Sequence, residues 1–238
     1  MKFLKSQIFA ATLAILCLAQ PAQAREVRVA YESAHDAEID RGIAQLQSGD
    51  PKGATQSFGA IIAAYEKDYP SGPDYRCSVS AKHADYLAGQ LANAPGTSDI
   101  VILGPNWCLA LWGYGFALID LNRSADAEVY LAKSVAMAPY DAHYRNEYAE
   151  LFKNRRDWQR SYLEFSLAWE VVSHDPKGPD RSVAARSLRG MGFNKIELGD
   201  LDEAERLFKQ SLEFDPDSPA AANELRYIAR LRAAGGGN

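Results

Sequence analysis

One pattern recurs along the chain at a fixed period, the interval from Gly115 to Ala149, and it constrains the fold more than any other feature. Its fullest copy spans 185–218. There Gly192, Ala204 and Ser211 are the small residues at positions 8, 20 and 27, and Phe208 is the large residue at position 24. Two antiparallel helices pack closely only where small residues let their backbones approach, and a large side chain then fills the space beside them. The pattern therefore predicts a tightly packed pair of helices.

The ends of these two helices carry signals of their own. Gly199 can adopt the left-handed backbone conformation that ends the first helix. Pro216 stops the second helix because it lacks the N–H that a helix interior requires. The same frame fits three further segments of the chain, 35–68, 108–141 and 142–175, and the last two of these are adjacent and in phase.

The four segments resemble tetratricopeptide (TPR) repeats, most clearly in "LRGMGFNKIELGDLDEAERLFKQSLEFDP" at 188–216. The resemblance implies an all-α fold, a right-handed superhelical solenoid of stacked helix-turn-helix repeats with a C-terminal capping helix. Solenoids of this kind hold other proteins on their surface. The sequence as a whole also resembles exported bacterial TPR proteins of uncharacterised role.

The stretch before the second clear copy is harder to interpret. Gly42 and Gly115 both occupy position 8, and the interval between them is about twice the repeat period, which leaves room for one further degenerate repeat. We expect a helix from Cys77, followed over 99–105 by a short second helix or an extended connector. After the last repeat, the helical spacing of Leu225 and Ile228 predicts the capping helix.

These features divide the chain into consecutive parts. They are a signal peptide (1–24), an N-terminal lead-in (25–34), degenerate TPR-like repeats (35–107), two tandem repeats (108–175), a loop (176–184), a strong repeat (185–218), a capping helix (219–234) and a disordered tail (235–238).

The N-terminus has the composition of a secretory signal peptide. Lys2 and Lys5 precede an apolar run over 8–18, and Ala22-Gln23-Ala24 is a small-x-small cleavage site. We expect cleavage after Ala24 and delivery to the periplasm or the exterior. No later stretch is long and apolar enough to span a bilayer, so stable membrane insertion is not expected after cleavage.

Charge and motifs exclude several classes of function. The formal net charge is −5 and the longest basic run is Arg155-Arg156, which argues against nucleic acid as a partner. The sequence has no HExxH, no Cys/His metal spacing, no phosphate loop and no Gly-x-Ser-x-Gly motif. We therefore predict no catalytic residues, no metal and no cofactor.

Cys77 and Cys108 remain after signal cleavage, and two interpretations of the pair stay open. An oxidising compartment favours one disulfide, whereas both residues can equally be buried thiols that act as small apolar side chains. A less favoured enzymatic hypothesis pairs Cys77 with His83 as nucleophile and base. A separation of six positions places these two on different sides of one helix, which argues against that pairing.

The resemblance implies that a ligand lies along the concave face, lined by positions 2, 5, 9 and 12 of each repeat's first helix. These positions predict an aromatic and aliphatic patch followed by a basic pair. We expect a peptide with apolar anchors and an acidic group there. The predicted groove residues are Trp112, Phe116, Ile119, Asn146, Glu150, Arg186, Arg189 and Phe193.

The groove residues also have competing interpretations. Asn146, Arg186 and Arg189 resemble part of the set with which some TPR domains clamp a C-terminal carboxylate. Alternatively, Trp112 packs between repeats and the arginines pair with surface carboxylates. The leading functional hypothesis is a non-enzymatic periplasmic adaptor or scaffold that binds a peptide segment of another protein. The alternative is a stoichiometric subunit of an envelope assembly or secretion machine.

Overall fold

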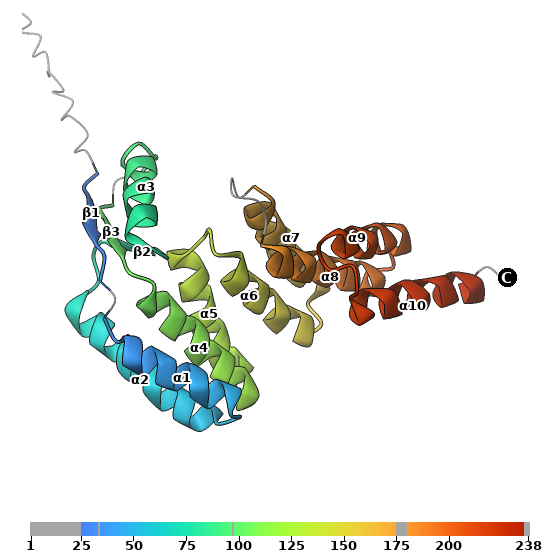
Figure 1. The fold of residues 1–238 in the computed structure, drawn as a ribbon, viewed down its shortest axis with the longest axis horizontal. Coiled ribbons are helices and arrows are strands. Elements are labelled where there is room, and N and C mark those ends of the chain that lie inside the picture. Colours follow the sequence, from blue (N-terminus) through green and yellow to red (C-terminus); the bar gives the residue numbers. More distant parts are fainter. Residues whose placement is uncertain (1–24, 33, 97, 175–179, 236–238) are drawn as a thin grey trace, which may run out of the picture.

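The computed structural model describes residues 25–32, 34–96, 98–174 and 180–235. The expected signal peptide, residues 176–179 of the loop expected over 176–184 and the end of the expected tail lie outside the described residues. The rest of that loop differs from the prediction, because a helix begins at Arg181 with Asp180 as its N-cap. Most of the described chain is helical, and the helices stack as consecutive hairpins in chain order (Figure 1). The predicted α-helical solenoid is therefore confirmed.

In the described ranges, four helical hairpins and a final helix build the solenoid. The hairpins are α1 (Asp36–Gln47) with α2 (Pro51–Asp68), α4 (Asn106–Asp120) with α5 (Ser124–Met137), α6 (Ala142–Asn154) with α7 (Trp158–Ser173), and α8 (Arg181–Glu197) with α9 (Leu201–Phe214). The last helix, α10 (Pro219–Gly235), packs against α9 at the C-terminal end, where the sequence predicts a capping helix.

Large residues at position 24 pack against small ones, as the repeat pattern predicts. The buried ring of Phe58 in α2 lies so close to α1 and α4 that a Cβ on Gly42 or Gly113 would come within 2.6 Å of it. In the later repeats, Phe165 of α7 stands in the same relation to Gly190 of α8. One large ring thus joins its own hairpin to the next, because only glycine leaves the required space.

The turns inside the hairpins also repeat. Position 15 of each described repeat has a left-handed backbone conformation, with φ between 58° and 81°; the residues are Gly49, Asn122, Arg156 and Gly199. The next residue is the N-cap of the second helix. In three repeats it is an aspartate whose carboxylate accepts a hydrogen bond from the backbone N–H three positions further on: Asp50, Asp157 and Asp200.

The segment between the first two hairpins differs from the prediction of a further degenerate repeat. It forms β2 (Asp74–Cys77), α3 (Ala81–Ala92) and β3 (Ile100–Leu103), and β3 also pairs with β1 (Val27–Ala30) near the N-terminal end of the described chain. All pairing is parallel, in the order β1-β3-β2, with Ile100 opposite both Val27 and Asp74.

The physical reason for this difference is the burial of β3. Its residues, Ile100-Val101-Ile102-Leu103, are all buried, as expected for a central strand covered on both faces. The helix expected from Cys77 begins only at Ala81, after the Ser80 hydroxyl caps it, because Cys77 belongs to strand β2. Helix α3 is the crossover connection that two parallel strands require.

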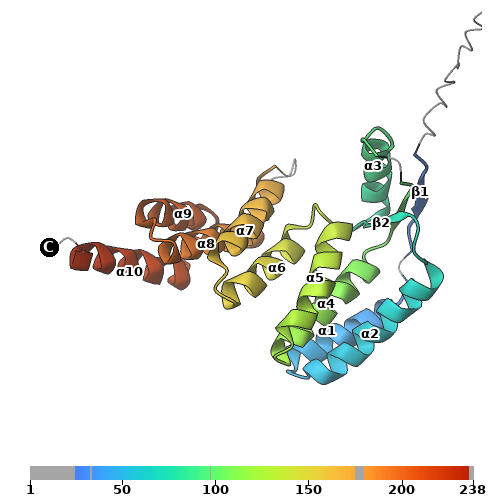
Figure 2. The same ribbon diagram turned by 180° about the vertical axis from the view of Figure 1, so that it is seen from behind.

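This β2–α3–β3 unit is an insertion between consecutive repeats. Helices α2 and α4 pack against each other as the adjoining helices of neighbouring repeats do, although the unit separates them in the chain. The sheet and α3 lie at one end of the helices α1 to α5, and Figure 2 shows the same arrangement from behind. No helix in the described ranges has the length and apolar character needed to cross a bilayer.

Candidate functional site

The predicted groove residues lie on α4, α6 and α8, the first helices of three neighbouring repeats. Trp112 of α4 contacts Phe116 on its own helix and reaches His143 and Tyr144 on α6, with ring centroids 5.8, 5.2 and 6.3 Å away. The Trp112 ring is half-buried, so one part of it packs between repeats and the rest faces outward. Both interpretations of this tryptophan therefore describe part of its environment.

An apolar strip runs along α4 on this side. It consists of Leu109, Trp112, Phe116 and Ile119, all of them half-buried. Leu109, Trp112 and Ile119 pack against the core below them. The strip is partly covered, since Trp112 packs against α6, but each of its four residues keeps some exposed surface, so the strip can contact a ligand.

The part of this face on α6 and α8 is charged, and its charges are paired. Arg186 donates a hydrogen bond to Glu147 at 2.5 Å and lies 4.0 Å from Glu150, which also pairs with Lys153. Burial lowers the pKa of the Arg186 guanidinium, but the hydrogen bond and charge of Glu147 outweigh it and raise that pKa overall. Arg186 therefore stays charged and engaged.

Arg189 is also paired, with Asp215 at 2.8 Å. Both arginines thus have carboxylate partners, as the competing interpretation expects. Further along the chain, Phe193 and Trp158 form a T-shaped pair with ring centroids 6.0 Å apart, and the Lys153 ammonium lies 5.4 Å from the centre of the Phe193 ring. The predicted residues of α6 and α8 thus belong mainly to contacts between repeats.

The structure contradicts the prediction that Asn146 contacts a ligand. Asn146 is 1% exposed; its Nδ2 donates to the Val183 carbonyl at 3.3 Å, and its Oδ1 accepts from the Ser187 hydroxyl at 2.9 Å. The amide therefore locks α6 onto α8 instead of facing the groove. The carboxylate clamp of Asn146, Arg186 and Arg189 stays a prediction; in this structure its amide is buried and both of its arginines pair with carboxylates.

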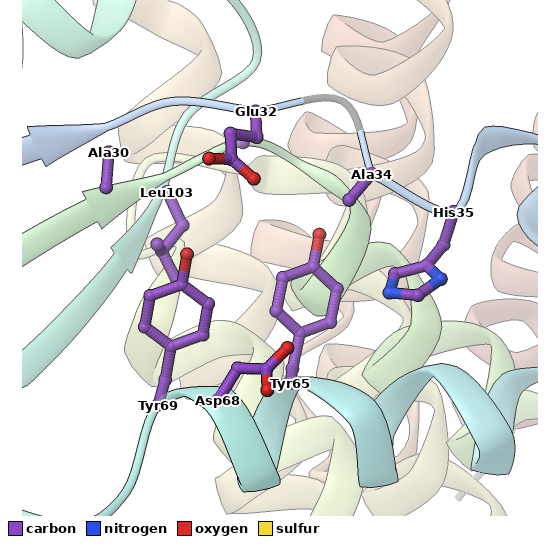
Figure 3. Close-up of a pocket in the computed structure, with 9 residues that line it drawn as sticks. Ala30, Glu32, Ala34, His35, Tyr65, Asp68, Tyr69 and Leu103 are labelled. Carbon is purple, nitrogen blue, oxygen red and sulfur yellow. The ribbon is translucent and has the colours of Figure 1, made fainter.

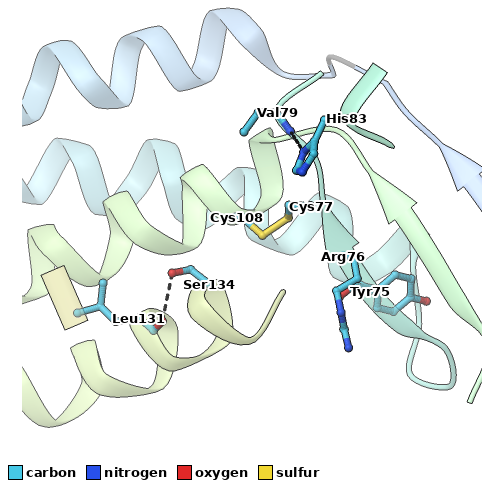
Figure 4. The surroundings of a disulfide bond; sticks show 8 residues. All are labelled: Tyr75, Arg76, Cys77, Val79, His83, Cys108, Leu131 and Ser134. Atoms are coloured by element: carbon cyan, nitrogen blue, oxygen red, sulfur yellow. Dashed lines mark hydrogen bonds between the residues drawn. A yellow bond between two sulfur atoms is a disulfide. The ribbon is translucent and has the colours of Figure 1, made fainter. Parts of the chain in front are cut away.

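The two cysteines form a disulfide between β2 and the first turn of α4 (Figure 4). The Cα atoms of Cys77 and Cys108 are 6.2 Å apart, within the range that a disulfide spans. The hypothesis of a Cys77–His83 nucleophile pair is wrong in this state, because Cys77 has no free thiol. His83 instead lies with its Nδ1 3.0 Å from the Ser78 hydroxyl and its ring against Tyr140. Over the described ranges, no group of three or more His, Cys, Asp or Glu residues is arranged to hold a metal ion.

One site escaped the sequence analysis entirely. A cleft of about 50 Å³ opens between the carboxyl ends of β1 and β3 and the C-terminal end of α2 (Figure 3). Its lining residues are Ala30, Glu32, Ala34, His35, Tyr65, Asp68, Tyr69, Leu103 and Gly104. Three separate parts of the chain contribute, so no local motif signals the cleft.

Comparison with known proteins gives the class of fold. No protein-family model and no curated protein matches the sequence. Among solved structures, PilF of Pseudomonas aeruginosa is similar, with a TM-score of 0.59 and 15% identity over 84% of this chain and 70% of that chain. MamA has a TM-score of 0.54 and 14% identity over 81% of this chain and 84% of its own.

YrrB, described as a TPR protein with an unusual peptide-binding site, has a TM-score of 0.50 and 14% identity over 82% of this chain and 75% of its own. At these identities the likeness concerns the fold alone. Together with the repeated packing and turns described above, it shows that this chain has the α-helical solenoid fold of TPR-repeat proteins.

Proposed function

We propose that this protein is an exported, non-enzymatic adaptor that binds a peptide segment of another protein along the face formed by α4, α6 and α8. The observation that carries the proposal is the apolar strip Leu109–Trp112–Phe116–Ile119, which is half-buried on a first helix and keeps part of its apolar surface exposed. Aromatic residues in such positions are the usual anchors of protein interfaces. YrrB, whose fold is similar, is described as having a peptide-binding site.

The charges on this face refine the expected ligand. Glu147, Glu150 and Asp215 balance Lys153, Arg186 and Arg189, so an acidic segment has no clear electrostatic advantage over a neutral one. We therefore propose that apolar side chains of the ligand, in contact with the strip, contribute most of the binding free energy. The paired charges can form hydrogen bonds with main-chain or polar groups of the bound segment at the rim of the interface.

Export is supported by two independent features. The first is the signal-like N-terminus, with Lys2, Lys5 and the Ala22-Gln23-Ala24 cleavage site. The second is the Cys77–Cys108 disulfide, since such bonds persist mainly in oxidising compartments. The proposed location is the periplasm. Fractionation of a bacterial host that expresses the full chain, with mass spectrometry of the product, tests this: we expect a periplasmic protein that begins at Arg25 with both cysteines oxidised.

Peptide selection against the protein that begins at Arg25 tests the binding proposal. We expect a displayed random-peptide library to yield sequences that share large apolar residues. A chosen peptide should lose about tenfold or more of its affinity to the Phe116→Glu and Ile119→Glu variants, because a charge then faces its apolar anchors.

Val129→Glu and Leu163→Glu are the matched controls, since these residues are exposed apolar side chains on the second helices α5 and α7. Equal losses in the α4 variants and the controls, or no enriched peptide, would refute the assignment of the strip. Co-purification in fixed ratio with other envelope proteins would favour the alternative, a subunit of a larger assembly.

A further inference from the structure

The cleft beside the sheet has a location that favours ligand binding. It lies outside the carboxyl ends of the parallel strands β1 and β3, where open parallel sheets usually bind their ligands. The backbone around it is close-packed: a Cβ on Gly104 would lie 1.9 Å from the Glu32 carbonyl oxygen. Glycine at this position thus lets the connection after β3 pass directly against the connection after β1.

The C-terminal end of α2 and its C-cap residue, Tyr69, present three polar side chains to the cleft. Tyr65, Asp68 and Tyr69 are spaced three and four positions apart, which places them on one face of the helix. From the opposite side, Glu32 extends over the cleft, and the hydroxyls of Tyr65 and Tyr69 point toward the segment that carries it (Figure 3). Over the described ranges, neither Glu32 nor Asp68 has an ion-pair partner.

Tyr65 provides a second, independent observation. Its side chain is 6% exposed, yet its hydroxyl has no hydrogen-bond partner among the described residues. A buried hydroxyl without a partner is costly, so its presence needs an explanation, and a bound ligand is one. The ring is held in place by Trp107, which stacks on it at 5.4 Å with planes only 4° apart, and by the His35 ring at 5.5 Å.

The charges around the cleft favour a positively charged ligand. Burial, together with the charges of Tyr69, Glu32 and Asp36, raises the pKa of Tyr65 to about 12, so its hydroxyl stays neutral. The pKa of Tyr69 is also raised, first by burial and then by Glu32, against a smaller opposing effect of Arg28 on β1. Arg28 does not line the cleft.

We propose that this cleft binds a primary ammonium group, which Glu32 and Asp68 neutralise and to which the Tyr65 hydroxyl supplies an acceptor. An ammonium has three donors and no acceptor, which matches a site that offers two carboxylates and phenol oxygens. An anion would be repelled by the carboxylates. A metal ion is not favoured, because the described residues offer no suitable cluster of ligands.

With a volume of about 50 Å³, the cleft admits only the end of an elongated ligand. The ammonium can belong to a lysine side chain of a partner protein or to a small free amine. The cleft lies apart from the apolar strip on α4, so ammonium binding here is independent of the proposed peptide binding. Failure of either leaves the other standing.

Titrations followed by NMR of ¹³C-labelled tyrosine rings test the proposal. The probes are butylammonium against 1-butanol, and acetyl-Gly-Lys-Gly-amide against the same peptide with norleucine in place of lysine. We expect saturable shifts of the Tyr65 and Tyr69 signals with the charged member of each pair only. Tighter binding of 1,4-diaminobutane than of the lysine peptide identifies a free amine as the ligand, and the reverse order identifies a partner's lysine.

Variants of the full mature protein show whether the named residues act. Glu32→Gln and Asp68→Asn should each weaken ammonium binding about tenfold, since each removes one charge-assisted hydrogen bond. Glu66→Gln is the matched control: it changes a carboxylate on the same helix that pairs with Lys133 and does not line the cleft.

Tyr65→Phe separates a binding role from a structural one. It should weaken ammonium binding while leaving the melting temperature unchanged or raised, because the lost hydroxyl has no partner in the described chain. Equal shifts with charged and neutral probes overturn the proposal. So does ammonium affinity that survives both Glu32→Gln and Asp68→Asn.

Discussion

The disulfide between Cys77 and Cys108 fastens the inserted β2–α3–β3 unit to the solenoid. Cys77 ends strand β2, and Cys108 lies fully buried in the first turn of α4. Without this bond, the unit is held by its packing on α4 and α5 and by the pairing of β3 with β1. The bond therefore fixes the position of the sheet, and the carboxyl ends of β1 and β3 in this sheet form one side of the cleft.

Removal of this disulfide should destabilise the N-terminal half selectively. The bond closes a loop of 31 residues, for which the chain-entropy relation gives a loss of about 3 to 4 kcal/mol in the free energy of unfolding. We expect the Cys77→Ala/Cys108→Ala variant to unfold at lower denaturant concentration. Hydrogen exchange of β2, α3 and β3 should be faster, whereas exchange in α8 to α10 should change little, since repeats contact only their neighbours.

Reduction of the wild-type protein should reproduce this result and should have no further effect on the double variant. Uniform acceleration of exchange along the whole solenoid would contradict the selective role assigned to the bond.

Two helical glycines should respond to alanine in opposite directions. A Cβ on Gly113 would lie 2.5 Å from the Phe58 ring, in the contact between α4 and α2. Gly113→Ala should therefore cost about 1–3 kcal/mol of stability through overpacking, in spite of the better helix propensity of alanine. A Cβ on Gly89 in α3 would have no described heavy atom within 4 Å apart from its chain neighbours and the backbone of its own helix, so Gly89→Ala should stabilise by up to about 1 kcal/mol.

Urea denaturation of the two variants beside the wild type measures both effects. If both substitutions shift the midpoint in the same direction, the Phe58–Gly113 contact does not limit the packing of these repeats.

The repeat pattern predicted those parts of the fold that depend on neighbours in the chain. Phe58 against Gly42 and Phe208 against Gly192 follow from positions 24 and 8, and the left-handed turn at Gly199 follows from its place between two helices. The inserted sheet could not be predicted in this way. Strand β1 pairs with β3 although the whole first hairpin, β2 and α3 lie between them in the chain, and both strands are short.

The apolar run Ile100–Leu103 carried the only local signal for the sheet, and the long interval between Gly42 and Gly115 suggested another repeat instead. Asn146 shows a related limit. Its position in the repeat faces the groove in the general pattern, but the small Ser187 lets α8 approach and cover it. The cleft depends on Glu32, Asp68 and Gly104 meeting from separate segments, which only the tertiary structure reveals.

The hydrogen bonds of Asn146 should contribute to stability and not to ligand binding. Asn146→Ala removes the donor to Val183 and the acceptor for Ser187, and we expect a loss of about 1–3 kcal/mol. Asn154→Ala, on an exposed residue at the end of the same helix, should change stability by less than about 0.5 kcal/mol.

A double-mutant cycle with Ser187→Ala isolates the pair. We expect the two changes to be non-additive, because each removes the same hydrogen bond. At equal concentration of folded protein, a peptide that binds the apolar strip should bind the Asn146→Ala variant as tightly as the wild type. A specific loss of peptide affinity with unchanged stability would mean that Asn146 contacts the bound peptide after all.

The second repeat lacks a helix cap that the other three have, and supplying it should stabilise the protein. Arg123 occupies the position that is Asp50, Asp157 or Asp200 elsewhere, and its side chain makes no capping hydrogen bond to α5. Arg123→Asp should add a capping acceptor and place a negative charge at the helix N-terminus, together worth about 1 kcal/mol. The ion pair that it removes, Arg123 with Asp126, is exposed and contributes at most a few tenths of a kcal/mol.

Thermal unfolding of three variants separates the cap from the ion pair. Arg123→Ala removes the ion pair without adding a cap and should be slightly less stable than the wild type. Arg123→Asn should recover most of the gain of Arg123→Asp, because the amide oxygen can accept the same hydrogen bond without a charge. An Asp variant no more stable than the Ala variant would mean that the backbone at Arg123 does not permit the cap that the other repeats form.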